Sequence, residues 1–279
     1  VVLVGETNEA SLSGVEVVVG SAGDDRVTVS TNDIQSISGG SGIDDVTLTD
    51  ASGNTVDLAG VEVITGSAGD DSVTVSTNDI QSISGGSGID DVTLTDASGN
   101  TVDLAGVEVI TGSDGSDILT VTDDTSVMVD GGDGADTLTG NVGGDTLLGG
   151  SGSDTLIGGG GADFVDGGQD DDLLELDGSA GVTAEGGDGT DTVVLVGETN
   201  EASLSGVEVV TGSAGDDSVT VSTNDIEAIS GGEGFDDVTL TDASGNTVAL
   251  AGVEAITGSA GDDILTVTDD TSVTLDGGD

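Results

Sequence analysis

The chain has 279 residues, of which 56 are Asp or Glu and only Arg26 is basic, so its formal net charge at pH 7 is −55. Nucleic acid and anionic membrane surfaces are disfavoured as partners, because binding either of them needs clustered Lys and Arg. The chain also has no cysteine, no histidine and no apolar run of about 18 residues, so the sequence predicts no disulfide, no thiolate metal site and no membrane span.

This charge leaves two interpretations open, a disordered acidic chain or a fold that bound cations complete. A compact fold with such a charge repels itself strongly unless cations neutralise it. Hydrophobic residues make up 34% of the chain and recur at regular intervals, which argues against simple disorder. We therefore expect a fold that depends on metal ions.

In chain order, the first predicted elements are short strands separated by Gly-rich turns. After the second such turn the sequence predicts strands over Thr47–Thr49, Thr55–Leu58 and Val61–Thr65. In the third strand we expect Ile64 to face inward, because alanine replaces Val63 in a later copy of this segment. No stretch shows helical periodicity, and no proline interrupts strand pairing.

Long internal repeats organise the chain. Segment 27–67 recurs letter for letter at 73–113, a diverged copy occupies 212–257, segment 1–18 returns at 193–210, and segment 112–133 returns in similar form at 258–279. The repeats predict three parts: coils of alternating 19- and 27-residue period in 1–111, a dense block in 112–194, and a second copy of the long repeat in 195–279. The first copy opens and the last copy stops within a repeat, so we expect an excerpt from a longer repetitive polypeptide.

The dense block contains a nine-residue phrase, Gly-Gly-x-Gly-x-Asp-x-(Leu/Val)-x, five times without a gap from Gly131 onward. Altered forms of the phrase open at Gly20 and Gly39 and at their counterparts in the other repeats. Each phrase joins a turn to a strand, and its eighth residue is always Val or Leu, as expected for a side chain that points into a core. Closely spaced carboxylate and carbonyl oxygens are the ligands that Ca²⁺ prefers.

The sixth residue of all fourteen phrases is aspartate, and we expect these aspartates to be calcium ligands. They are Asp25, Asp44, Asp71, Asp90, Asp117, Asp136, Asp145, Asp154, Asp163, Asp172, Asp191, Asp217, Asp236 and Asp263. A cap for the turn is the other role open to each of them. Stacked carboxylates without a cation would repel one another, which favours the metal.

The phrase resembles the RTX, or haemolysin-type, calcium-binding repeat of secreted bacterial proteins. The resemblance implies an all-β fold, a parallel β-solenoid (β-roll) in which two nonapeptides make one coil and several Ca²⁺ ions lie in the turns. Carried onto this chain, it places Asp136, Asp154, Asp172 and Asp191 on one edge and the aspartates at 145 and 163 on the other. With two Phe and no Trp or Tyr the core would be thin, so calcium must contribute much of the folding free energy.

The spacing of the turns predicts about twelve stacked coils. Twelve of the phrases follow one another at steps of 18–19 or 26–27 residues. We interpret each step as one coil, the longer steps carrying an excursion of eight or nine residues. This interpretation places those twelve turns along a single edge, with a continuous row of calcium on that edge and a patchy row on the other.

Composition and repetition favour a structural role over catalysis. Without His, Cys or Lys the familiar nucleophilic triads cannot be assembled, so we expect no enzyme in this chain. The leading expectation is a calcium-stabilised extracellular rod that serves as a filament, biofilm matrix fibre or adhesin stalk and associates with itself. The alternatives are a surface-layer lattice protein, the secretion and folding segment of an RTX toxin or hydrolase, and, least favoured, an ice-binding adhesin region.

The expected location is outside a bacterial cell, secreted or at the cell surface. Weak calcium sites suit the millimolar Ca²⁺ found outside cells. The RTX resemblance implies type I secretion, with unfolded passage through a calcium-poor cytosol and folding outside. An acidic chain without Ca²⁺ would stay expanded, which fits that route.

Overall fold

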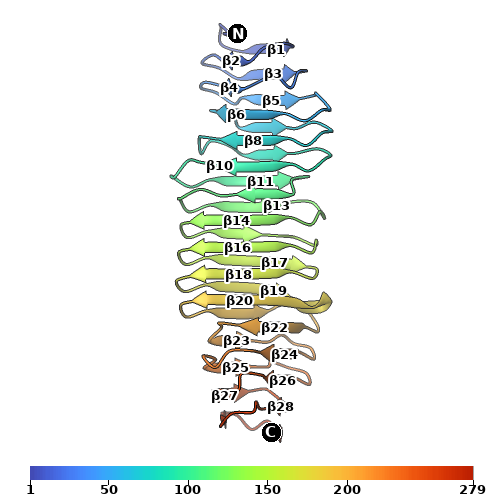
Figure 1. The fold of residues 1–279 in the computed structure, drawn as a ribbon, viewed down its shortest axis with the longest axis vertical. Coiled ribbons are helices and arrows are strands. Elements are labelled where there is room, and N and C mark those ends of the chain that lie inside the picture. The colour runs from blue at the N-terminus through green and yellow to red at the C-terminus, as the bar shows by residue number, and fades with distance from the viewer. Residues whose placement is uncertain (279) are drawn as a thin grey trace. The chain divides into compact units, whose positions relative to one another are not determined.

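A computed structural model describes residues 1–278 and divides the chain into two compact units, Val1–Thr137 and Leu138–Asp279. Within each unit the chain winds through coils of two short strands that lie in two facing sheets (Figure 1). Every strand pair that the structure gives is parallel, and each strand pairs with the strand two places later in the sequence. The fold is therefore the all-β, parallel β-solenoid that the repeats predict.

In the first unit each sheet contains seven strands, and β15 (Thr137–Thr139) lies at the boundary between the units. One sheet consists of β1 (Asn8–Leu12), β3 (Asp25–Val29), β5 (Asp45–Leu48), β7 (Val63–Thr65), β9 (Ser82–Ser84), β11 (Thr101–Ala105) and β13 (Ile118–Val121). The other consists of β2 (Val17–Val19), β4 (Ser36–Ser38), β6 (Thr55–Ala59), β8 (Ser72–Val75), β10 (Asp91–Leu94), β12 (Val109–Thr111) and β14 (Met128–Asp133).

The second unit is built in the same way. One sheet consists of β17 (Thr155–Gly160), β19 (Leu173–Asp177), β21 (Thr192–Leu195), β23 (Val209–Thr211), β25 (Ala228–Ser230), β27 (Thr247–Ala251) and β29 (Ile264–Val267). The other consists of β16 (Thr146–Ser151), β18 (Phe164–Gln169), β20 (Val182–Asp188), β22 (Glu201–Ser205), β24 (Ser218–Val221), β26 (Asp237–Leu240), β28 (Ala255–Thr257) and β30 (Thr274–Asp276). A single 3₁₀ turn, Gly178–Ala180, follows β19.

Columns of aliphatic side chains form the core of each unit. Since side chains alternate between the two faces of a strand, every second residue points inward. In the first unit Val27 lies beside Val46, and Val46 lies beside Ile64, with each side chain no more than 3% exposed. In the second unit Leu156, Leu174 and Val193 continue the pattern. Ile64 is buried and Val63 is not, as the sequence predicts.

The predicted number of coils and the predicted single calcium edge need correction. Three strands, β5, β6 and β7, lie between the Gly-rich turns that open at Gly39 and Gly66, and they belong alternately to the two sheets. The supposed excursion is therefore half a coil, and an odd number of strands moves the next Gly-rich turn to the opposite edge. Each unit has about seven coils, so the chain has about fourteen instead of about twelve.

The predicted continuous row of calcium turns along one edge is wrong for the same reason. In the first unit the phrases at Gly20 and Gly39 precede β3 and β5, whereas those at Gly66 and Gly85 precede β8 and β10 in the other sheet. The Gly-rich turns therefore form short rows, and successive rows lie on opposite edges of the solenoid. The divisions predicted at residues 111 and 194 follow the sequence repeats and remain predictions. Among the described residues no helix is long and apolar enough to cross a membrane.

Candidate calcium sites in the turns

All fourteen predicted aspartates lie where a Gly-rich turn enters a strand. Thirteen of them are no more than 4% exposed, and Asp263 is half-buried. Carboxylates are rarely buried so completely unless partners satisfy them. The hydrogen bonds around each aspartate therefore show which of its carboxylate oxygens have a donor and which do not.

The aspartates form short rows that run from coil to coil. Asp172 Oδ1 accepts a hydrogen bond from the backbone N–H of Asp154 at 2.8 Å, and Asp191 Oδ1 accepts one from Asp172 at 2.9 Å. The same bond joins Asp25 to Asp44 in the first unit. Further rows join 71 to 90, 117 to 136, 145 to 163 and 217 to 236. Residues 154, 172 and 191 share one edge of the second unit and residues 145 and 163 the other, as the RTX resemblance implies.

One class of turn satisfies its carboxylate without a metal. Asp71 Oδ1 accepts hydrogen bonds from the backbone N–H and side-chain Nδ2 of Asn54, both at 2.7 Å, and from Ser67 Oγ at 3.1 Å. Its Oδ2 accepts the N–H of Ser67 at 2.6 Å. We call this Asn–Ser–Asp arrangement the amide lock. It recurs at Asp25, Asp117, Asp217 and Asp263, the aspartates of the Gly-Ser-x-Gly-x-Asp phrases.

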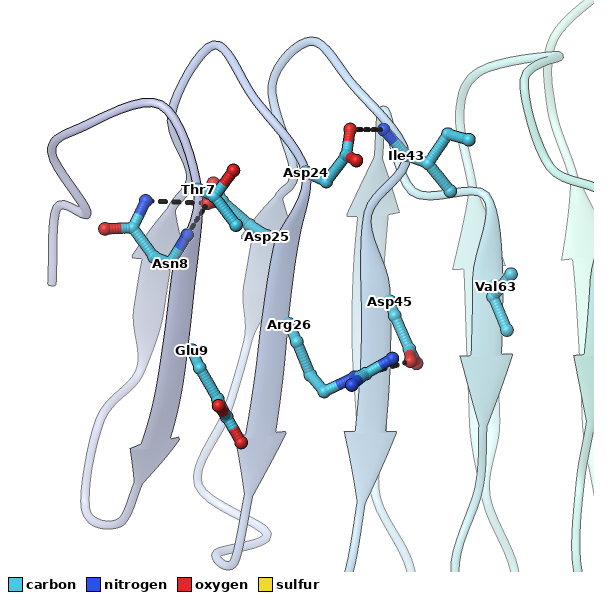
Figure 2. Close-up of a pocket in the computed structure, with 9 residues that line it drawn as sticks. All are labelled: Thr7, Asn8, Glu9, Asp24, Asp25, Arg26, Ile43, Asp45 and Val63. Carbon is cyan, nitrogen blue, oxygen red and sulfur yellow. Dashed lines mark hydrogen bonds and ion pairs between the residues drawn. The ribbon is translucent and has the colours of Figure 1, made fainter.

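Figure 2 shows the amide lock at Asp25, where Asn8 directs both its backbone nitrogen and its side-chain amide at the carboxylate. Burial alone would raise the pKa of Asp25, but the hydrogen bonds from Asn8 and Ser21 outweigh it and lower the pKa. The lock therefore holds this aspartate in its ionised form.

The ion pair of Arg26 with Asp45 nearby is exposed, so it contributes little to stability.

The second class of turn leaves one buried carboxylate oxygen without a donor. Asp172 uses Oδ1 in the row, and its Oδ2 is buried with no hydrogen-bond partner. Burial, together with the charges of Asp191 and other neighbouring aspartates, raises the pKa of Asp172 to about 6. The same orphaned Oδ2 occurs in Gly-Gly-x-Gly-x-Asp phrases at Asp44, Asp90, Asp163, Asp191 and Asp236. An orphaned, buried carboxylate oxygen costs free energy, and a cation would remove that cost.

The surroundings of this oxygen fit Ca²⁺. A Cβ built on Gly167, the first residue of the phrase, would lie 2.3 Å from Asp172 Oδ2 and 2.6 Å from the Gly186 carbonyl of the next coil. The two oxygens are thus no more than 4.9 Å apart, the sum of these distances. Oxygens that share one Ca²⁺ at about 2.3–2.6 Å lie up to about 5 Å apart. Among the described residues no three acidic side chains converge as a ligand set, so backbone carbonyls would have to supply much of the coordination.

Two sets of polar residues that lie at the two ends of these rows were not predicted from the sequence. An asparagine stands 17 residues before each locked aspartate, at positions 8, 54, 100, 200 and 246. A glutamate stands 17 or 18 residues after four of the other aspartates, at positions 62, 108, 208 and 254. The spacing recurs in every copy of the repeat, and a search for polar residues at one-coil distance from each aspartate would have found both sets.

Comparison with known proteins supports the calcium chemistry of the central block. No curated protein matches the chain closely enough to count as a relative. The family model of the RTX calcium-binding nonapeptide repeat matches four copies, at residues 128–147 and 139–174. These residues include Asp136, Asp145, Asp154, Asp163 and Asp172. The central turns of this solenoid therefore belong to the RTX family of calcium-binding nonapeptide repeats.

Proposed function

We propose that this chain is a calcium-stabilised structural β-solenoid of an exported bacterial protein, in which ions bound at the Gly-Gly-x-Gly-x-Asp turns complete the fold. The orphaned Oδ2 atoms of the second class of turn carry this proposal. They are buried, they recur from coil to coil, and they lie beside backbone carbonyls. When Ca²⁺ is bound, it supplies the positive charge that these oxygens lack.

The rest of the architecture supports a structural role. Each coil packs only against its neighbours, as in other solenoids whose stability is roughly a sum of repeat and interface terms. The near-identical repeats provide many equivalent turns and no unique site. We propose that the chain acts as a filament, matrix fibre or adhesin stalk outside the cell, associates with itself, and catalyses no reaction. The lack of His, Cys and Lys supports the last point.

One observation favours a second candidate. The nonapeptide copies that match the RTX family model are confined to a short block. A short block of this kind would also suffice as the secretion and folding segment of a toxin or hydrolase. In that role the chain would stay monomeric after calcium-dependent folding.

Folding and assembly can be tested on the same sample. EDTA-treated protein is titrated with Ca²⁺, with Mg²⁺ as the control ion, while circular dichroism and small-angle scattering are recorded. We expect a cooperative change from an expanded coil to a compact β-rich form with Ca²⁺ only, since Mg²⁺ demands stricter octahedral geometry and gives up its water reluctantly. A chain that is already compact and β-rich in EDTA contradicts the proposal.

Electron microscopy of the calcium-loaded protein then separates the two candidates. Filaments or lateral assemblies support the structural role. Monodisperse monomers at all protein concentrations favour the secretion segment.

A further inference from the structure

Four glutamates end four of the rows of aspartates, at turns that lack the nonapeptide phrase. They follow the strands β6, β11, β22 and β27 in the short sequence Gly-Val-Glu. These glutamates are Glu62, Glu108, Glu208 and Glu254. The RTX family model covers none of these four turns.

Each glutamate occupies the place in the row that an aspartate of the next coil would fill. Glu62 Oε2 accepts the backbone N–H of Asp44 at 2.6 Å, and Glu254 Oε2 accepts that of Asp236 at 2.9 Å. The pairs of Glu108 with Asp90 and of Glu208 with Asp191 repeat this bond at 2.8 and 2.7 Å. It is the bond that Asp191 makes with Asp172 in a regular row. The longer glutamate side chain replaces the shorter aspartate where the turn is shortened.

A second observation points to a ligand at the same place. The aspartate of each pair is no more than 2% exposed, and its Oδ2 is buried without a donor. A Cβ built on Gly39 would lie 2.4 Å from Asp44 Oδ2 and 1.9 Å from the carbonyl of Gly60, which belongs to the glutamate turn. The two oxygens are therefore no more than 4.3 Å apart, close enough to share one ion.

The same juxtaposition exists in all four copies. The glycine carbonyls involved are those of Gly60, Gly106, Gly206 and Gly252, each beside the orphaned Oδ2 of its aspartate. Two copies lie in the first unit and two in the second. Around Glu62 the structure also has a polar cavity of about 420 Å³, lined by the turn 40–43, Asp79 and Gln81. This cavity gives a hydrated cation access to the Glu62 carboxylate.

We propose that each of these four Asp–Glu pairs holds a Ca²⁺ ion, with the aspartate Oδ2, the glycine carbonyl of the Gly-Val-Glu turn and the glutamate carboxylate as ligands. Four of the rows thus end in a site that the nonapeptide pattern does not describe. In each pair a buried aspartate and an adjacent glutamate, which is buried at Glu62 and half-buried in the other three copies, gain a counter-charge in this way, which removes their mutual repulsion. This proposal rests on the proposed function, because it assumes that the turns bind calcium.

The test compares the calcium content of three forms of the full chain by equilibrium dialysis and elemental analysis. The test variant carries Glu62→Gln, Glu108→Gln, Glu208→Gln and Glu254→Gln, which keeps the acceptor for the aspartate N–H and removes the negative charge. The control carries the same change at four exposed glutamates, Glu9→Gln, Glu201→Gln, Glu227→Gln and Glu233→Gln. Both variants lose four negative charges. A difference in calcium content between them therefore cannot come from the change in net charge.

We expect the test variant to bind four fewer Ca²⁺ ions than the natural sequence, and the control to bind the same number. Equal calcium content in all three forms overturns the inference and leaves the proposed function standing. A natural sequence that binds no calcium overturns both. If the fourfold variant does not fold, Glu62→Gln alone is measured in its place. It should lose one ion, and an unchanged ion count again overturns the inference.

Discussion

At the scale of single residues, the same aspartate of the same phrase has two different environments. Asp71 has a donor on both carboxylate oxygens, supplied by Asn54 and Ser67. Asp90, one coil later, has one buried oxygen without any donor. A serine in place of the second glycine, together with the asparagine of the previous coil, makes this difference. The motif alone therefore does not determine which aspartates need a cation.

The amide lock should stabilise the folded, calcium-loaded protein. Asn54→Ala removes the side-chain donor to the buried charge of Asp71, which should cost about 1–3 kcal/mol of unfolding free energy. Urea unfolding in saturating Ca²⁺ measures this cost. Asn78→Ala, at an exposed turn, is the matched control and should cost less than about 0.5 kcal/mol. Equal effects of the two substitutions would refute the lock.

The orphaned carboxyls predict an unusual dependence of stability on pH. Burial and neighbouring carboxylates raise the pKa of Asp172 and Asp236 to about 6, above their ordinary value of 3.8. The folded state therefore binds more protons than the unfolded state between about pH 4 and pH 6. Protonation of these two carboxyls therefore stabilises the folded state. This stabilisation is complete below pH 3.8 and is lost as the pH rises through about 6.

Circular dichroism of the metal-free chain at pH 7 and pH 5 checks this expectation. The chain should be expanded at pH 7 and should gain β structure at pH 5, because protons then neutralise the buried carboxyls. In saturating Ca²⁺ this advantage of pH 5 should disappear or reverse, because protons and Ca²⁺ compete for the same oxygen. A metal-free chain with less β structure at pH 5 than at pH 7 would contradict this expectation.

At the scale of elements, the first glycine of each phrase allows two coils to approach closely. At Gly167 a Cβ would lie 2.3 Å from the carboxylate of its own turn and 2.6 Å from a backbone carbonyl of the next coil. Real Cβ atoms do not come so close to backbone oxygens, so neither turn can accommodate a methyl group without moving. The close approach of the two coils is what requires glycine here. The backbone conformation does not require it, because φ of Gly167 is not positive.

Gly167→Ala should accordingly weaken the turn and its ion together. We expect a loss of about 1–3 kcal/mol from overpacking and a loss of one bound Ca²⁺. Gly277→Ala is the control, because nothing lies within 4 Å of a Cβ at that glycine. Calorimetric calcium titration of both variants provides the measurement. A Gly167→Ala protein with the calcium content and stability of the control would show that the turns are looser than described.

The fold was predictable at the level of the strand, and less so at the level of the coil. The fixed Val or Leu after each aspartate predicts the strands and the inward column that contains Val46 and Ile64. The 27-residue step was misleading, because sequence spacing does not tell an excursion from an extra half-coil. Only the pairing of β6 with β4 and β8 shows that this segment is a full strand of the opposite sheet.

The candidate site was predictable in part, for a related reason. The positions of the aspartates follow from the phrase itself. Their partners, such as Asn54 and Glu62, lie about one coil away in sequence and belong to turns without the phrase. A local motif contains no information about what the next coil places beside it.

At the scale of the whole molecule, charge and fold depend on each other. The chain carries a net charge of −55, and its buried carboxylates recur in both units. Without cations this self-repulsion opposes the compact state. Bound Ca²⁺ would both neutralise charge and satisfy the orphaned oxygens, so the free energy of ion binding becomes free energy of folding. The locked turns would then be the parts of each unit whose carboxylates need no ion.

The positions of bound ions test the account most directly. Crystals grown in Ca²⁺, with anomalous difference maps recorded at a long wavelength, would locate each ion against the turns. We predict peaks at the orphaned oxygens of Asp44, Asp90, Asp163, Asp172, Asp191 and Asp236, and none at the locked carboxylates of Asp25, Asp71, Asp117, Asp217 and Asp263. Peaks at the locked turns, or empty turns at the first set, would contradict the account.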